Sequence, residues 1–302
     1  MKKAALFFLL LCAVFSASFA FARRGILPFG SLRNRTLDCE RFDHQFCKAP
    51  YPLRNKPFTI IAVGVNNGAT VEKTLASVFA QNYENYRLIY IDDASDDGSF
   101  EAARGFIQNS PHLHRVEFIR NEERSGFLAS LTYGVRTCSD HEIIVVLEGS
   151  DWLAHEWVLQ RLNAYYADPE LWITYGNDRN FPTFQEGKSR PIYLNEWKER
   201  GFRGYPFVFS HLNTFYAALF KKIEEADFIY QGKFFQADAP LAYMLPMLEM
   251  AEDHFQFIPE VLYINGNLKG GAHELSEIYE KVIRGLNPYQ PLSALSFVSE
   301  GK

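Results

Sequence analysis

The sequence predicts an α/β fold with a mainly parallel, doubly wound, Rossmann-like sheet. Short apolar runs alternate with segments of helical period between residues 57 and 175, as in repeated strand and helix units. Two of the apolar runs end in acidic residues, the first in Asp92 and Asp93 and the second in Glu148, which Asp151 follows closely. Because ligands bind beyond the carboxyl ends of parallel strands, these side chains should face one crevice.

The first predicted strand covers residues 58–65 and ends in the turn signal Asn66-Asn67-Gly68. Thr70 is placed to cap the next helix, whose apolar residues recur at i, i+4, i+7 and i+8: Val71, Leu75, Val78 and Phe79. Further strands are predicted at residues 87–91, 115–119 and 143–147, and further helices at residues 100–108 and 126–137.

The pattern weakens after Trp152. A helix with Val158, Leu159 and Leu162 should stop at Asp168-Pro169, and a strand should follow at residues 171–175. Residues 176–210 are rich in aromatic side chains without a clear period, so irregular structure is expected there.

Length and composition allow one large core. The chain has 302 residues, 47% of them hydrophobic, and a net charge of −5, which gives no indication of a nucleic-acid surface. We expect one domain over residues 57–292, preceded by a lead segment at residues 23–56 and followed by a tail at residues 293–302. Cys138 falls in an apolar helical pattern, which predicts a buried thiol.

The N-terminus is typical of an export signal. Lys2 and Lys3 precede an uncharged stretch at residues 4–22, and Ala20-Phe21-Ala22 matches a small-x-small cleavage site. Cleavage would release the protein into a periplasm, a lumen or the extracellular space. Alternatively, residues 4–22 stay as a membrane anchor, since about 20 apolar residues span a bilayer. Cys39 and Cys47 could pair in such an oxidising compartment, or could be unrelated thiols.

Several motifs resemble family-two glycosyltransferases of the A-type fold over roughly residues 57–292. The resemblance rests on the ordered set Asn66-Asn67, Ser77 to Tyr83, Ile91 to Ser99, Arg120-Asn121-Glu122, Gly126, and Leu147 to Leu153 in the place of an Asp-x-Asp motif. It implies an α/β sheet of the A-type glycosyltransferase fold and nucleotide-sugar chemistry.

The resemblance implies a nucleotide-sugar site in the first half of the domain. Its residues would be Asn66, Asp92, Asp93, Arg120 and Asn121, with the two aspartates accepting hydrogen bonds from the base and ribose. The alternative is that the aspartates only shape a turn, as Asx residues do in many proteins.

The second acidic cluster would hold the divalent cation, Mn²⁺ or Mg²⁺, of such enzymes. The resemblance assigns Glu148 and Asp151 to it, with His273 completing the metal shell. Ser150 stands where a second carboxylate is usual, and a hydroxyl is a poorer ligand for a hard cation. An acidic loop without metal is the alternative.

The resemblance also implies a catalytic base. Similar enzymes carry an aspartate at the start of a helix where this chain has Pro240, and Asp238 lies two residues earlier. Asp238 could accept the proton of the acceptor hydroxyl, or it could simply cap the helix that follows. His211 is expected in the acceptor-side wall or in the fold rather than as a base.

Two classes of function therefore remain open. The first is an inverting transferase that moves a hexose from a nucleoside diphosphate sugar, with a UDP-sugar favoured, to a hydroxyl of a glycan, lipid or protein. The second is a degenerate relative that binds nucleotide or glycan, or acts as a scaffold, because Ser150 and Pro240 affect the metal and the base together.

Overall fold

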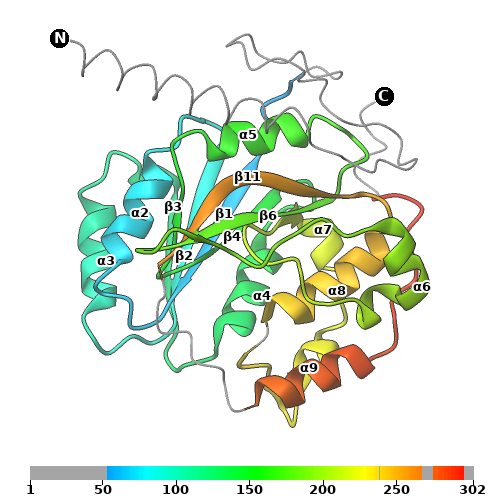
Figure 1. Cartoon of the computed structure of the whole chain (residues 1–302). Helices are drawn as coiled ribbons and strands as arrows, with labels where there is room; N and C mark the ends of the chain where they lie inside the picture. The colour runs from blue at the N-terminus through cyan, green and yellow to red at the C-terminus, as the bar shows by residue number, and fades with distance from the viewer. Residues whose placement is uncertain (1–52, 238, 267–274, 296–302) are drawn as a thin grey trace, which may run out of the picture. The chain divides into compact units, whose positions relative to one another are not determined.

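The structure is a computed structural model, and it describes residues 53–237, 239–266 and 275–295. A nine-stranded sheet in the order β3-β2-β1-β4-β8-β6-β11-β5, with β7 paired to β6, forms its centre (Figure 1). The strands of this sheet are β1 (Phe58–Gly64), β2 (Tyr86–Asp92), β3 (Val116–Arg120), β4 (Ile143–Glu148), β5 (Trp152–Leu153), β6 (Ile173–Asn180), β7 (Gln185–Glu186), β8 (Thr214–Tyr216) and β11 (Phe255–Asn265). A separate two-stranded ribbon pairs β9 (Ile229–Tyr230) with β10 (Lys233–Phe234).

The first half of the sheet confirms the predicted parallel arrangement. β1 is parallel to both β2 and β4, and β2 is parallel to β3. Every residue of β1 is buried, because helices cover both faces of this part of the sheet. The register pairs Gly64 with Asp92 and Val63 with Glu148, so both acidic strand ends lie at one edge.

Helices surround the sheet, with α2 and α3 together on one side and α6, α8 and α9 grouped on the other (Figure 1). Their bounds are α2 (Val71–Phe79), α3 (Ser99–Gln108), α4 (Phe127–Thr137), α5 (Val158–Tyr165), α6 (Leu194–Gly204), α7 (Ala217–Phe220), α8 (Ala239–Ala251) and α9 (Ser276–Gly285), with short 3₁₀ turns at Leu113–Arg115 and Glu225–Phe228.

The beginning of α2 differs from the prediction. The helix buries Val71, Leu75 and Val78 as expected, but the Thr70 side chain makes no capping hydrogen bond. Its hydroxyl instead donates to the Asn67 carbonyl oxygen at 3.2 Å. Thr70 therefore stabilises the turn before the helix.

Residues 176–210 are only partly irregular, so that expectation was wrong for the strands and the helix in this segment. β6 continues to Asn180, turns into β7, and α6 occupies Leu194–Gly204. The end of β6 is polar because it leaves the apolar core, which removes the hydrophobic signal of a strand. α6 is interrupted at Gly201, which has a non-helical φ of 66°. A helix in two short pieces does not produce a continuous helical period in the sequence.

Helix α8 is the longest of the deeply buried helices in the described part of the chain. All of its residues except Pro240 are buried, which agrees with a sequence that is apolar on every side. It has 13 residues, fewer than the roughly 20 that cross a bilayer. Among the helices in residues 53–237, 239–266 and 275–295, none is long and apolar enough for a membrane span.

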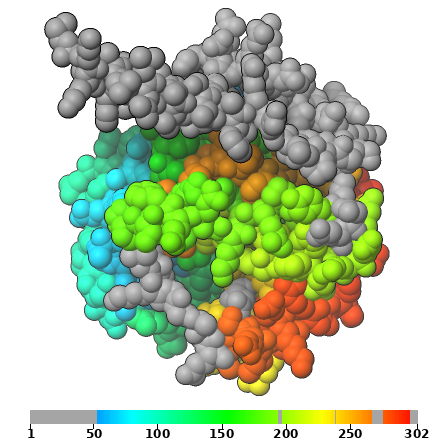
Figure 2. Space-filling view, in the orientation of Figure 1, coloured from blue at the N-terminus to red at the C-terminus, as the bar shows by residue number. Residues whose placement is uncertain are grey.

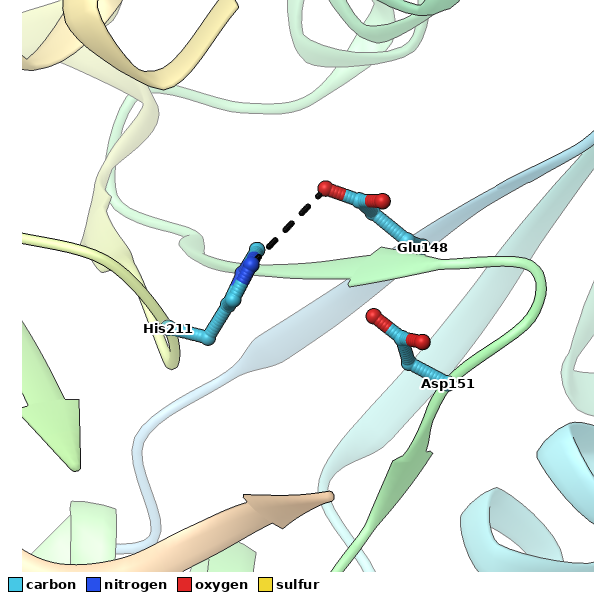
Figure 3. Close-up of side chains that lie close together, drawn as sticks. All are labelled: Glu148, Asp151 and His211. Atoms are coloured by element: carbon cyan, nitrogen blue, oxygen red, sulfur yellow. Dashed lines mark ion pairs between the residues drawn. The ribbon is translucent and has the colours of Figure 1, made fainter. Parts of the chain in front are cut away.

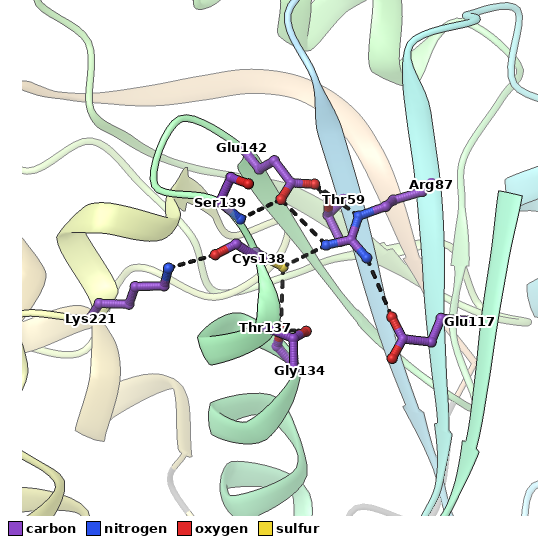
Figure 4. A network of polar contacts seen from close by, with 9 residues as sticks. All are labelled: Thr59, Arg87, Glu117, Gly134, Thr137, Cys138, Ser139, Glu142 and Lys221. Carbon is purple, nitrogen blue, oxygen red and sulfur yellow. Dashed lines mark hydrogen bonds and ion pairs between the residues drawn. The ribbon is translucent and has the colours of Figure 1, made fainter. Parts of the chain in front are cut away.

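The opposite edge of the sheet is tied together by a polar network around Arg87 and Glu142 (Figure 4). Arg87 Nε donates to Glu142 Oε1 at 2.8 Å, and the Thr59 hydroxyl donates to the same oxygen at 2.6 Å. The network joins β1, β2 and the segment before β4. It lies at the opposite ends of the strands from Asp92 and Glu148. Cys138 is a buried free thiol in this network, as predicted.

Candidate functional site

Three side chains from separate segments meet at the carboxyl edge of the sheet. Glu148 ends β4, Asp151 lies in the turn before β5, and His211 precedes β8 (Figure 3). One ligand atom from each lies within 4.8 Å of the others, and His211 Nε2 is 3.9 Å from Glu148 Oε1. Two carboxylates and an imidazole at this spacing could hold a divalent cation.

Asp151 is buried and held by three donors. The Tyr263 hydroxyl donates to Oδ2 at 2.6 Å, while the Gly266 N–H and the Ser150 hydroxyl donate to Oδ1 at 2.8 and 3.2 Å. Burial, with a contribution from the Glu148 charge, raises the pKa of Asp151 to about 6, although the Tyr263 hydrogen bond opposes the shift. Bringing this carboxylate into its charged form is therefore costly without a nearby positive charge.

His211 is fixed by an aromatic neighbour. Its ring stacks on Tyr263 with centroids 4.6 Å apart and an interplanar angle of 9°. Burial lowers the pKa of His211, and the charges of Asp151 and Asp178 act in the opposite direction. Burial also raises the pKa of Glu148. A neutral imidazole beside carboxylates is the form that coordinates metal.

The first acidic pair contacts the chain itself. Asp93 Oδ1 accepts hydrogen bonds from Asn121 Nδ2 at 2.7 Å and the Ser125 N–H at 2.8 Å, and Asp93 Oδ2 accepts from the Gly126 N–H at 2.9 Å. Asp93 thus holds the loop that leads into α4, where Gly126 has a φ of 90°. Its direct role toward a nucleotide stays a prediction.

Asp92 has a free oxygen. Its Oδ2 accepts from the Ser95 N–H at 3.0 Å and lies 3.7 Å from Arg120 Nε. Oδ1 is buried and has no hydrogen-bond partner among the residues that the structure describes. The Arg120 guanidinium also covers the Phe100 ring at 4.2 Å from its centroid.

The two acidic segments are joined through the turn after β1. Asn66 exchanges two hydrogen bonds with Asp96, through Nδ2 to Oδ1 at 2.7 Å and from the Asp96 N–H at 3.0 Å. Asn67 Nδ2 donates to the Gly149 carbonyl oxygen, which also accepts from the Thr74 hydroxyl at 2.9 Å. This turn therefore sets the spacing between the Asp92 and Glu148 regions.

The sequence-predicted site residues fall into three groups. Asn66, Asp92, Asp93, Arg120 and Asn121 lie together at the ends of β1, β2 and β3, and Glu148 and Asp151 lie at the end of β4. The remaining two, Asp238 and His273, lie outside the described residues. In the described part of the chain, His211 occupies the histidine position of the acidic cluster.

Sequence reasoning did not identify His211 as a member of this cluster or Asp178 as a residue near it. His211 was expected only in the acceptor-side wall or in the fold, because no spacing rule connects it to Glu148, 63 positions earlier in the chain. Asp178 falls in the segment expected to be irregular. The sequence signal that could have located Asp178 was a strand that begins with the apolar Ile173 and continues into polar residues.

An aromatic cluster stands next to the acidic residues. Lys73 Nζ lies 3.4 Å from the ring centroid of Trp152 and 4.3 Å from that of Phe181. The rings of Trp152 and Phe181 meet edge to face at 5.4 Å. These contacts join α2, β5 and the turn between β6 and β7.

Several solved structures share this fold at low sequence identity. The mannosyltransferase PcManGT from Pyrobaculum calidifontis, in complex with GDP-Man and Mn²⁺, matches with a TM-score of 0.54 and 18% identity, over 80% of this chain and 69% of that one. S. aureus TarS 1-349 in complex with UDP-GlcNAc matches with a TM-score of 0.54 and 13% identity, over 75% and 64%. The expected A-type glycosyltransferase fold is confirmed.

Proteins with similar sequences are also glycosyltransferases or polysaccharide synthases. The poly-beta-1,6-N-acetyl-D-glucosamine synthase of Staphylococcus aureus (strain COL) is 25% identical over 138 residues, which are 43% of this chain and 32% of that protein. Glycosyltransferase GlyA of Streptococcus pneumoniae serotype 4 is 27% identical over 132 residues, 43% of this chain and 18% of GlyA. The matches thus span a third or less of these relatives. The model of glycosyl transferase family 2 matches residues 59–232, more than half of the sequence, and the chain belongs to that family.

Proposed function

We propose that this protein is a metal-dependent glycosyltransferase that moves a hexose from a nucleoside diphosphate sugar to a hydroxyl acceptor with inversion. The observation that carries the proposal is the cluster of Glu148, Asp151 and His211 at the sheet edge that also holds Asp92. Membership of glycosyl transferase family 2 supports it. A UDP-sugar is the first candidate donor, and a glycan, a lipid or a protein would supply the acceptor hydroxyl.

In this proposal the ends of β1, β2 and β3 bind the nucleoside. Asp92 has a buried oxygen, Oδ1, without a partner among the described residues, and this oxygen could accept a hydrogen bond from a base N–H. Asp93 and Asn121 act by holding the loop before α4, and Asn66 by holding the turn after β1. This division assigns direct contact to Asp92 and support to the other residues.

The acidic cluster fits a hard divalent cation. Glu148, Asp151 and His211 offer two carboxylates and one imidazole, and burial raises the pKa of both acids. Mn²⁺ or Mg²⁺ bound there would offset the charge that develops on a diphosphate leaving group. Tyr263 would keep Asp151 and His211 in place through its hydrogen bond and its ring.

The remaining parts of the proposal concern the base and the location. We assign the acceptance of the hydroxyl proton to Asp238, directly before α8. His273 is proposed as an additional ligand. We propose export through the N-terminal signal, or anchoring by residues 4–22, which places the acceptor at or beyond a membrane.

A second candidate function is nucleotide or glycan binding without transfer. Ser150 favours it, because its hydroxyl donates to Asp151 at 3.2 Å and adds no negative charge to the cluster. Pro240, in the first turn of α8, stands where similar enzymes have the base. Both departures would reduce turnover and leave the fold and the nucleoside side intact.

The two candidates are separated by titrating the purified protein with UDP-glucose, UDP-galactose, UDP-GlcNAc and GDP-mannose, with and without Mn²⁺, and then measuring release of free nucleotide. A transferase should bind one donor more tightly with Mn²⁺ and release nucleoside diphosphate when acceptor or water takes the sugar. Binding without release would support the second candidate. No binding of any donor would refute both nucleotide-dependent functions.

A further inference from the structure

Asp178, near the end of β6, is buried, and one of its carboxylate oxygens has no hydrogen-bond partner in the described part of the chain. The residue is 3% exposed, and its Oδ1 accepts no hydrogen bond from the described residues. Burial raises the pKa of Asp178, although the His211 and Arg179 charges oppose the shift, because a buried carboxylate loses hydration that its neighbours replace only in part. A bound cation or a proton would stabilise such a carboxylate by compensating its charge.

The position of Asp178 places it beside the acidic cluster. In the parallel ladder of β6 and β11 it pairs with Tyr263, so the two side chains leave the same face of the sheet. Tyr263 is the residue that bonds Asp151 and stacks on His211. Asp178 is therefore next to the side chain that organises the cluster.

The backbone of His211 passes over the same face of β6. A Cβ at Gly176, two residues before Asp178 and on the same side of the strand, would lie 3.3 Å from the Leu212 nitrogen and 3.7 Å from the His211 carbonyl oxygen. The charges of His211 and Asp151 both act on the pKa of Asp178, which burial raises. The strand pairing with Tyr263 and the nearby His211 backbone thus place Asp178 beside the site that contains Glu148, Asp151 and His211.

We infer that Asp178 supplies, from β6, the negative oxygen that Ser150 lacks in the acidic motif. It would join the metal centre either as a ligand or through a bridging water, and so raise the number of carboxylates around the cation to three. This inference rests on the metal centre of the proposed function. It explains why a glycosyl transferase family 2 chain could keep cation binding with a serine in the motif.

Gly187 packs directly against the Asp178 carboxylate and restricts its position. The Gly187 N–H donates to the Asp178 carbonyl oxygen at 3.0 Å, and a Cβ at Gly187 would overlap the Asp178 carboxylate. Gly187 follows β7, in the hairpin whose residues are drawn in green on the front face in Figure 2. Only a glycine leaves room for the carboxylate in this place.

The test measures binding of Mn²⁺ alone, by electron paramagnetic resonance of the free ion, to the full chain and its variants. Asp178→Asn should weaken Mn²⁺ binding about 10- to 100-fold, the range seen when supporting groups of metal sites are removed. Gly187→Ala, which displaces the carboxylate and keeps its charge, should also weaken binding. Gly105→Ala is the matched control, because a Cβ there meets nothing within 4 Å.

A repair variant distinguishes a lost ligand from a damaged fold. Ser150→Asp should restore most of the affinity that Asp178→Asn removes, because the carboxylate returns in the neighbouring motif. The metal-free Asp178→Asn protein should unfold at the same or a higher temperature than the wild type, since an unpartnered buried charge is gone. A residue that only supported the fold would instead lose stability.

Equal Mn²⁺ affinity of the wild type and Asp178→Asn would overturn the role of Asp178 and leave the three-residue centre standing. Failure of Ser150→Asp to restore binding would overturn it as well. A wild type that binds no Mn²⁺ would remove the metal centre and this inference together. Mn²⁺ binding without donor binding would instead overturn the glycosyltransferase proposal and leave the role of Asp178 intact.

Discussion

Tyr263 holds Asp151 by a hydrogen bond of 2.6 Å from its hydroxyl to Oδ2. The same hydroxyl oxygen accepts the N–H of Glu148 at 3.2 Å, and the ring stacks on His211. One tyrosine on β11 thus contacts all three members of the acidic cluster. It is the physical link between the end of β4 and the segment before β8.

Tyr263→Phe should weaken both stability and Mn²⁺ binding. The change keeps the ring against His211 but removes the hydroxyl that pairs with the Glu148 N–H and one Asp151 oxygen. Leaving such a buried group without its partner costs about 1 to 3 kcal/mol of stability. Tyr83→Phe is the matched control, because its hydroxyl donates to the Lys56 carbonyl oxygen at 2.8 Å, away from the cluster. Urea unfolding should show losses in both variants, and Mn²⁺ titration should show a loss in Tyr263→Phe alone. Unchanged Mn²⁺ affinity in Tyr263→Phe would contradict the positioning role.

Asp93→Ala should weaken nucleotide binding by disordering the loop before α4. The substitution removes the buried acceptor of three donors, from Asn121, Ser125 and Gly126. Each donor left without a partner costs up to about 3 kcal/mol of stability. Calorimetry with UDP should show reduced affinity, together with faster hydrogen exchange at Ser125 and Gly126. Asp140→Ala, an exposed change at the opposite edge, should alter neither quantity. Wild-type affinity for UDP in Asp93→Ala would exclude this aspartate from the nucleotide site.

Gly149→Ala should destabilise the protein strongly. A Cβ there would overlap Gly64 and lie 2.8 Å from Asn67 Nδ2 and 2.9 Å from the Val63 carbonyl oxygen, so β1 and β4 would have to separate. Overpacking of this kind costs about 1 to 3 kcal/mol. Gly105→Ala, in the open part of α3, should instead stabilise by about 0.5 to 1 kcal/mol, because alanine favours a helix. Equal denaturation midpoints for the two variants would contradict the predicted crowding.

Cys138 should react slowly with thiol reagents in the native state. Burial raises its pKa to about 11, although the Arg87 charge opposes the shift, so the reactive thiolate is scarce at pH 8. Peptide mapping after iodoacetamide should find Cys138 modified only when urea is present. Because the native pKa is raised, the unfolded thiol releases its proton first, and stability is lost as pH rises from about 9 toward 11. Cys138→Ala should reduce that loss, and an identical pH dependence would refute the shift.

The sequence by itself determined the alternation of strands and helices from residue 57 to residue 175. It also placed Asp92 and Glu148 at one edge, because an apolar run followed by an acidic residue fixes where a parallel strand ends. These are local properties, readable from the period of a short segment. The same local reading gave the buried positions of α2 and the burial of Cys138.

Only the tertiary structure decided which histidine and which further acid accompany Glu148 and Asp151. His211 reaches them because β8 runs antiparallel between β4 and β6, and Asp178 lies beside Tyr263 because β6 pairs with β11. The contact between Asp93 and the loop before α4 likewise depends on how β2 and β3 lie together. Pairings between distant strands have no sequence period, since their register is set by packing of the whole sheet.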